Sequence, residues 1–529
     1  MPAQTKEMWP GIKLITLSNV GIRLTKARKT PSDKVSIIMK SISNTDNSIV
    51  YSFPGKVRFF YGFGSIADGG INIIFGVYLL FYFTQVRGLS GTLAGLAIFI
   101  ALLVDAITDP IMGSISDNCQ SRWGRRHPFI YASILPFGAC FYLLFNSPQG
   151  LSQNQLFVWM VAFMVGVRVS YTFYAIPSSA LAAELTDDFD ERTRIVSWRI
   201  LFGWFGSVVL TQIALRYYLV PSVEFSDGRF NESAYGELAL VSALAMMLAV
   251  FVCAAGTHSQ IPRLKQAPAK TRFSLKRVIS ELKGPFSNRS FIALVFAALF
   301  TSAGVGYSTA LTFYLETYFW ELSTLELAQF VYPVGLATLL GFTATSPLVE
   351  RFDKKQLAIV TAVIYLIVAP LPLYLRMLGL MPENGDPWLL PILMCAVFVS
   401  CLLVVSNSII FGSMFVDVID ENELFTGLRQ EGVFNSALAF VFKSVSGVGG
   451  FMAGFVLDLV AFPKDLAPGE VPPETLVKLA LSVGLGATVL TILSVIFLTK
   501  YTITRVRYHE ILAVLAERRF SVSNAKGCF

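Results

Sequence analysis

Two aspartates lie four residues apart inside a long apolar stretch of the sequence. In the run Asp105-Ala-Ile-Thr-Asp109-Pro110, residues four apart share one face of a helix, so both carboxylates project to the same side. Like charges this close repel unless a proton or a cation lies between them. The Thr108 hydroxyl, and the backbone carbonyl that loses its donor to the proline ring, add further oxygens. This group predicts a binding site for Na⁺, or a carboxylate pair that shares a proton.

Other charged residues lie equally deep, where a charge costs roughly 2.5–3.5 kcal/mol even on insertion scales. We therefore expect them to face a shared interior rather than lipid. The aspartate pair could bind a coupling cation, form a structural salt bridge, or do both, with a lysine relieving the pair when no cation is bound. The residues concerned are Asp68, Asp105, Asp109, Arg168, Arg199, Glu316 and Lys443.

Long apolar segments must hold these residues in place. The chain of 529 residues is 54% hydrophobic and only 15% charged, whereas soluble chains carry roughly 25% charged residues. A helix that crosses the bilayer core needs about 20 mostly apolar residues. We predict an all-α membrane protein with spans at 57–86, 91–115, 128–147, 153–184, 194–220, 236–256, 288–318, 325–348, 355–378, 387–416, 429–462 and 476–500.

The basic residues are concentrated in every second connection between these spans, and the net charge is +7. Cytoplasmic loops of membrane proteins hold the excess of Lys and Arg. The alternation therefore predicts a multi-pass protein of the cell (inner) membrane with both termini in the cytoplasm. A nucleic-acid-binding surface would gather its cations in one patch, so we expect no nucleic acid as a partner. The expected partners are membrane lipid and a small-molecule substrate, and we expect a monomer.

Charged clusters repeat at a nearly constant distance along the chain. The cluster starting at Arg122 follows the second span, and the one starting at Arg351 follows the eighth, 229 positions later. Asp187 and Asp417 follow the fourth and tenth spans and are 230 positions apart. A duplicated six-span unit is typical of transporters whose two halves move about a central site. We expect these charged cytoplasmic turns to form a gate through Arg122, Arg126, Asp187, Arg351, Asp417, Glu421 and Arg429.

This repeat and a basic stretch in the middle of the chain define the predicted domains. We predict a disordered cytoplasmic extension over 1–54, a six-helix half over 55–256, a cytoplasmic linker over 257–287, a second six-helix half over 288–500, and a cytoplasmic tail over 501–529.

Several kinds of chemistry have no matching motif. The six cysteines and three histidines show no metal-binding spacing, and the chain lacks the Walker A motif that cradles nucleotide phosphates. No residue set resembles a hydrolytic triad. We therefore expect no cofactor beyond a coupling ion, no metal beyond a possible Na⁺ at Asp105 and Asp109, and no enzyme activity. An intramembrane enzyme or a non-transporting receptor remains the alternative from another class.

Motifs spread over nearly everything after residue 55 resemble one family. They are Tyr61-Gly-Phe-Gly64, the run from Asp105 to Gly113, Ser121-Arg-Trp-Gly-Arg-Arg-His-Pro128, Ile176-Pro177, the run from Glu184 to Thr193, Asp417-Val-Ile-Asp-Glu421 and Thr426-Gly-Leu-Arg-Gln-Glu-Gly432. The sequence resembles the glycoside–pentoside–hexuronide:cation symporters, the melibiose permease family of the major facilitator superfamily. The resemblance implies twelve transmembrane helices in two pseudo-symmetric halves, and symport of a sugar-like or glycoside solute with Na⁺ or H⁺.

The resemblance also implies a set of cation ligands. Asp105, Asp109 and Thr172 take the places of the family's ligands for the coupling ion. Thr108, which we include in the predicted site, stands where melibiose permease has an asparagine. That difference leaves the choice between Na⁺ and H⁺ open.

For the substrate, the resemblance points to three further residues. Asp68 matches a first-helix carboxylate that binds sugar hydroxyls, Arg199 a fifth-helix arginine near the substrate, and Lys443 the lysine of helix eleven. We add Tyr171 as an aromatic side chain that could stack on the substrate, with packing as its other explanation.

The sequence departs from the family on the fourth helix. Ala175 replaces the carboxylate that grips galactoside hydroxyls, and Ser179 stands where a tryptophan would be, while Arg168 appears two turns before Ala175. A guanidinium binds carboxylate, sulfate or phosphate through paired hydrogen bonds. We therefore expect an anionic or zwitterionic substrate such as a uronide, unless Arg168 only neutralises an acid on helix two. A lysolipid or another amphiphile is the alternative substrate on the same fold.

Overall fold

A computed structural model describes residues 54–186, 188–264, 288–426, 447–464 and 466–526. These residues form helices and turns and contain no strand, which confirms the all-α prediction for this part of the chain. Eleven of the described helical segments are long and apolar enough to cross a membrane, and a shorter apolar helix covers Gly447–Leu459 within the predicted eleventh span. Nearly all of the predicted extension 1–54 and most of the linker 257–287 lie outside the described residues.

The first half contains six spans. The first is continuous through α2 (Gly55–Phe63), α3 (Ile66–Ile73), the π-helical turn η1 (Ile74–Tyr78), α4 (Leu79–Phe81) and a second π-helical turn, η2 (Tyr82–Val86). The others are α5 (Gly91–Asp117), α6 (His127–Phe145), α7 (Gln153–Leu185), α8 (Phe189–Ile213) with the π-helical turn η3 (Ala214–Tyr218), and α9 (Glu232–His258).

The second half begins with α11 (Arg289–Tyr314), which ends in the π-helical turn η7 (Leu315–Phe319). It continues through α12 (Thr324–Leu327), η8 (Ala328–Phe330), α13 (Val331–Arg351), α14 (Lys354–Val368), α15 (Leu371–Met377), α16 (Leu389–Thr426), the helix Gly447–Leu459, α18 (Pro473–Thr499) and α19 (Arg505–Lys526).

Local sequence explains where several of these helices begin. The Ser152 hydroxyl accepts a hydrogen bond from the Gln155 backbone, and the Gln155 side chain bonds back to Ser152, which forms a capping box at the start of α7. The Asp353 carboxylate accepts from the Lys355 and Gln356 backbone amides at the start of α14. Such caps satisfy amides that have no partner within the helix.

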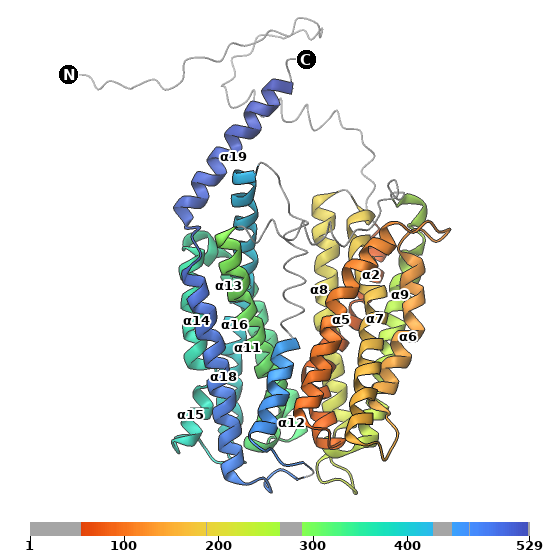
Figure 1. The fold of residues 1–529 in the computed structure, drawn as a ribbon, viewed down its shortest axis with the longest axis vertical. Coiled ribbons are helices and arrows are strands. Elements are labelled where there is room, and N and C mark those ends of the chain that lie inside the picture. The colour runs from red at the N-terminus through yellow and green to blue at the C-terminus, as the bar shows by residue number, and fades with distance from the viewer. Residues whose placement is uncertain (1–53, 187, 265–287, 427–446, 465, 527–529) are drawn as a thin grey trace, which may run out of the picture. The chain divides into compact units, whose positions relative to one another are not determined.

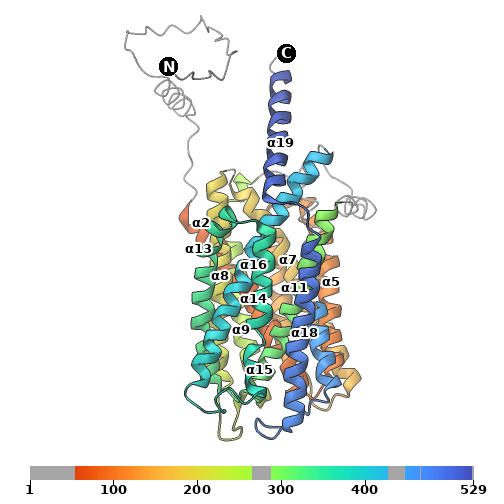
Figure 2. The same ribbon diagram turned by 90° about the vertical axis from the view of Figure 1, so that its left-hand side faces the viewer.

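The packing of helices repeats between the halves. Neighbours α5 and α7 in the first half correspond to α13 and α16 in the second, α6 and α7 to α14 and α16, and α6 and α9 to α14 and α18. In Figure 1 the first six spans, coloured red to green, lie together on the right, and the remaining spans lie on the left. Figure 2 shows the same long helices running side by side.

The predicted end of the tenth span is wrong. We expected a span at 387–416 followed by a charged turn, but α16 continues to Thr426. Asp417 and Glu421 therefore lie on the last turns of a helix. Both are buried and bonded: Asp417 accepts from Lys354, and Glu421 from Asn288. These partners outweigh the preference of charged residues for a solvated turn.

Candidate functional site

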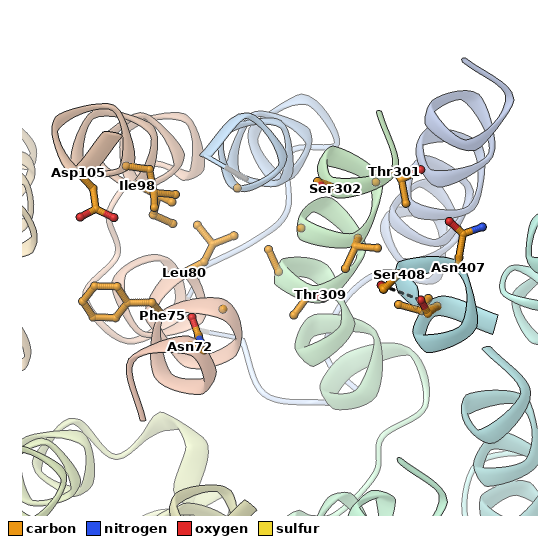
Figure 3. A pocket seen from close by; sticks show the side chains of 18 of the residues that line it. Asn72, Phe75, Leu80, Ile98, Asp105, Thr301, Ser302, Thr309, Asn407 and Ser408 are labelled. Atoms are coloured by element: carbon orange, nitrogen blue, oxygen red, sulfur yellow. Dashed lines mark hydrogen bonds between the residues drawn. The ribbon is translucent and has the colours of Figure 1, made fainter. Parts of the chain in front are cut away.

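A cavity of about 830 Å³ lies between the two halves. Figure 3 shows residues from the first half, among them Asp105 on α5 and Phe75 in η1, and others from the second half, on α11 and α16. The two walls differ in chemistry. Among the described residues, the charged ones that line the cavity come from the first half: Asp105, Asp109, Arg168 and Arg199.

The predicted aspartate pair meets a threonine of the neighbouring helix. The Thr172 hydroxyl on α7 lies 2.9 Å from Asp105 Oδ1 and 2.9 Å from Asp109 Oδ1. Asp105 and Thr172 are buried, and Asp109 is half-buried. A hydroxyl carries one proton, so this cluster is rich in lone pairs and can accept a further proton or a cation. Oxygen ligands of this kind suit hard cations.

The fourth predicted cation ligand does not join this cluster. The Thr108 hydroxyl donates to the backbone carbonyl of Asp105 at 3.2 Å, and Thr108 is not among the residues that line the cavity. A threonine hydroxyl in a helix commonly bonds the carbonyl three or four residues earlier.

Arg168 lies one helical turn before Thr172 and lines the same cavity. Its Nη1 is 3.7 Å from Asp105 Oδ2, and its guanidinium carbon is 5.1 Å from the centre of the Phe75 ring. Arg168 Nε is buried, and no residue in the described ranges accepts a hydrogen bond from it. The guanidinium is thus held by a loose ion pair and a cation–π contact, with N–H donors left over.

Asp68 on α3 lies behind the cavity wall. The Tyr171 hydroxyl donates to Asp68 Oδ1, and Arg199 Nη2 donates to Asp68 Oδ2 at 3.4 Å. Tyr171 and Arg199 line the cavity, whereas Asp68 does not. The structure therefore brings the three predicted residues together, with the carboxylate as a support for the other two side chains.

Three predicted site residues lie outside the described residues: Lys443, Asp187 and Arg429. A further deep charge, Glu316, lies in η7 and does not line the cavity.

Three of the predicted gate residues that the structure describes, Arg126, Asp417 and Glu421, bond side chains of their own halves. In the first half, Arg126 bonds Glu184 at 2.8 Å and also contacts Asp117. In the second half, Lys354 bonds Asp417 at 2.6 Å. Each pair joins the loop after a half's second span to the end of its fourth span, as a duplicated unit requires. The side chains of Arg122 and Arg351 are exposed.

At the opposite end, the halves are joined directly. The Asp458 carboxylate accepts hydrogen bonds from the Ser90 hydroxyl at 2.6 Å, the Gly91 amide at 2.9 Å and the Thr92 amide at 2.7 Å, at the start of α5. A Cβ atom at Gly454 would lie 2.0 Å from the Gly91 carbonyl oxygen, so this crossing requires glycine. A carboxylate at a helix N-terminus is favourable because the amide dipoles point toward it.

Other bonds between the halves lie near this crossing. The Tyr318 hydroxyl donates to the Gln85 side chain at 2.8 Å, Arg229 Nη1 donates to the Thr317 hydroxyl at 2.9 Å, and Lys464 donates to the Gly88 carbonyl at 2.8 Å. The described bonds across the halves thus concentrate at the end with few basic loops.

Sequence reasoning missed two polar residues of this arrangement. Asp458 lies close to the end of a predicted span, and its position beside a run of glycines could have indicated a contact between helices. Asn407 lines the cavity from α16, but a single uncharged amide within an apolar span gives no sequence signal.

Comparison with known proteins agrees with this arrangement. A sequence model of the family described as MFS/sugar transport protein matches residues 60–505. An isoprimeverose transporter of Lactiplantibacillus pentosus is 27% identical over 410 residues, which cover 76% of this chain and 80% of that protein. A putative glycoside/cation symporter, YagG, of Escherichia coli (strain K12) is 26% identical over 472 residues, covering 89% of this chain and 96% of that protein. A glucuronide carrier protein homolog of the same strain is 23% identical, covering 87% and 95%.

Two solved structures share the fold. A point mutant of the nucleoside transporter NupG has a TM-score of 0.59 at 13% identity and covers 84% of this chain and 99% of its own. A bacterial homolog of the human lysosomal transporter Spinster, described as inward-facing and occupied, has a TM-score of 0.58 at 12% identity and covers 84% and 94%. At these identities the likeness concerns the fold alone.

Proposed function

This chain belongs to the family of MFS/sugar transport proteins, and we propose that it is a secondary active transporter that moves a glycoside-like solute together with Na⁺ or H⁺. The family match and the relatives confirm the expected symporter resemblance and the major facilitator fold. They also exclude the enzyme alternative, because the family and the relatives are transporters. Relatives named for isoprimeverose, a glycoside and a glucuronide favour a glycoside-like solute.

One observation carries the proposed coupling: the Thr172 hydroxyl lies 2.9 Å from an oxygen of each of two carboxylates on the cavity wall. A cation or proton bound there would neutralise charge that is costly at this depth. It would also fix α5 against α7, which carries Arg168 and Tyr171. Cation binding would thereby order the wall that meets the solute, and the solute would raise cation affinity by the same factor.

The remaining donors of Arg168 support a solute with an acidic group. Asp105 is its loose partner in the described structure, and a cation bound at Asp105 would weaken that attraction. A carboxylate on the solute could then occupy the N–H groups that no described residue accepts. We therefore propose a uronide or another anionic glycoside as the preferred solute, with Arg168 and Arg199 on the solute side.

The position of the closed end supports an orientation and a conformational state. The basic loops support a cytoplasmic location of both termini, and the bonds around Asp458 would then join the halves at the outer side. We propose that the structure corresponds to an inward-facing state of a monomer. The clusters around Arg126 and Asp417 would exchange partners across the halves when the cytoplasmic side closes.

Transport into proteoliposomes tests this function. The purified full chain is supplied with labelled methyl β-D-glucuronide or methyl β-D-glucoside under an imposed Na⁺ or H⁺ gradient. We expect accumulation above equilibrium with one of the two gradients, abolished by an ionophore that dissipates it. Uptake that only equilibrates would refute coupling. Absence of counterflow for every glycoside, or a preference for a lysolipid, would refute the proposed solute class.

A further inference from the structure

The described residues that the second half contributes to the cavity wall are polar or apolar but uncharged. Their hydroxyl and amide groups include Thr301 and Ser302 on α11, Thr361 on α14, Asn407 and Ser408 on α16, and Thr491 on α18. Figure 3 shows Asn407 and Ser408 opposite the wall that carries Asp105.

Asn407 is the most constrained of these residues. It is 8% exposed, and its Nδ2 donates to the Thr361 hydroxyl oxygen at 3.1 Å and to the Ala358 carbonyl at 3.4 Å. The Thr361 hydroxyl donates its own proton to its helix backbone, at 2.9 Å to the Leu357 carbonyl. Both neighbours therefore act as acceptors, which only the amide nitrogen can satisfy. This fixes which end of the carboxamide is the oxygen.

The opposite end of the carboxamide has no such partner. Asn407 Oδ1 is buried and accepts no hydrogen bond from any residue of the described ranges. Leaving a buried acceptor unsatisfied is unfavourable. Because Asn407 lines the cavity, a donor supplied by an occupant of the cavity would remove that deficit.

Neighbouring hydroxyls have the same polarity. The Ser408 hydroxyl donates to the Val404 carbonyl at 2.9 Å, and the Thr491 hydroxyl donates to the Ala487 carbonyl at 2.8 Å. With their protons engaged, these groups offer lone pairs to the cavity. This wall therefore favours donors, whereas Arg168 on the other wall favours acceptors.

We infer that Asn407 is a specificity-determining residue whose carboxamide oxygen accepts a hydrogen bond from a hydroxyl group of the solute. The inference rests on the proposed function and adds a contact between the solute and the second six-helix half. A solute with an acidic group at one end and hydroxyls at the other would contact Arg168 in one half and Asn407 in the other. Such a solute bridges the halves, so its binding depends on their relative position.

Binding of matched sugars to the purified full chain tests this contact. The probes are methyl β-D-glucuronide, methyl β-D-glucoside and the monodeoxy analogues of whichever binds. In the wild type we expect loss of one particular hydroxyl to weaken binding about tenfold, about 1.4 kcal/mol. In Asn407→Leu the parent sugar should bind about tenfold more weakly than it does to the wild type. The analogue that lacks this hydroxyl should bind the variant as tightly as the parent sugar does. Asn154→Leu is the control, because Asn154 is an exposed amide at the start of α7 that is not among the residues lining the cavity.

Asn154→Leu should keep both the affinity, within about threefold, and the preference for the hydroxyl. Thr361→Val provides a second variant if Asn407→Leu does not fold, since it removes the acceptor that orients the amide. It should lower the preference for the hydroxyl at least about threefold. Unchanged preference in both variants, or equal weakening of the parent and every analogue, would overturn the inference while leaving the proposed function in place. If the wild type binds no glycoside or uronide, both proposals fail together.

Discussion

The two walls of the cavity differ in the kind of polar group that their described residues present. Among the described residues, the first half supplies every charged residue that lines the cavity: Asp105 faces Arg168, Asp109 accepts from Thr172, and Arg199 pairs with Asp68 outside the lining. The second half supplies hydroxyls and an amide whose protons are held by its own helices. Charges at membrane depth need partners, and Arg168 and Arg199 find theirs on neighbouring helices of the same half. On this basis we propose that the first half couples the ion and that both halves hold the solute.

Removing the negative charge from the cavity wall of the first half should have the largest effect on transport. In Asp105→Asn and Asp109→Asn we expect cation-driven accumulation to be lost, because the amide cannot hold a cation or release a proton as a carboxylate does. Uphill uptake in proteoliposomes measures this. Glu474→Gln is the matched control, because that carboxylate is exposed on α18 and pairs with Lys478 one turn further along the same helix. Undiminished accumulation in both aspartate variants would refute the cation site.

Removing the positive charge from the same wall should have the next largest effect. A charged hydrogen bond contributes roughly 1.5–3 kcal/mol, so Arg168→Gln should weaken a uronide by about one to two decades and leave the matched neutral glycoside nearly unchanged. Binding of the two sugars to both proteins measures the difference. The control is Arg216→Gln, an exposed arginine that bonds Gln212. Equal weakening of both sugars would reduce Arg168 to a structural counter-ion.

A smaller change separates ion binding from solute binding within the first wall. Thr172→Val keeps the shape of the side chain and removes the hydroxyl between the carboxylates, so we expect the cation concentration for half-maximal uptake to rise about three- to tenfold. Solute affinity at saturating cation should stay the same. Thr312→Val serves as the control, because its exposed hydroxyl only bonds the Ser308 carbonyl. A Thr172→Val protein with unaltered cation dependence would place the ion elsewhere.

The smallest expected effect concerns the contact that joins the halves. Asp458→Asn removes the charge that faces the N-terminus of α5, which should favour opening of the outer side by about two- to fivefold. Labelling of a cysteine placed at Thr309 in the cavity, in a chain without other reactive cysteines, measures access from each side. Glu326→Gln controls for a half-buried acid near the same end. Slower labelling from outside in Asp458→Asn would contradict the proposal that Asp458 holds the outer side closed.

Much of this arrangement was predictable because charge is conspicuous in an apolar sequence. The four-residue spacing predicts that Asp105 and Asp109 share a face, and the structure places Thr172 between them. The pairing of Arg168 with a helix-two acid was one of the two alternatives. Thr108 could not be assigned from its type alone, since its hydroxyl is also within reach of its own backbone. Asn407 gave no signal, because its role depends on the neighbours Thr361 and Ala358, which only packing reveals.

The π-helical turns and the end of α16 could not be predicted from the sequence either. The π-helical turns η2, η3 and η7 lie at the ends of their spans and η1 lies within the first span, and no motif in the sequence marks these turns. The extension of α16 to Thr426 was missed because charged residues predict a turn, whereas Lys354 and Asn288 supply partners from other helices.

Thermodynamic linkage tests the central claim, that the cation and the solute bind to one coupled site. The measurement is calorimetric titration of the purified chain with methyl β-D-glucuronide across a series of Na⁺ concentrations and pH values, together with titration of the cation with and without the sugar. We expect one cation to raise sugar affinity by a factor within roughly 5–150, the sugar to raise the affinity for that cation by the same factor, and Asp109→Asn to abolish both effects. Sugar affinity that is independent of Na⁺ and of pH would contradict the account.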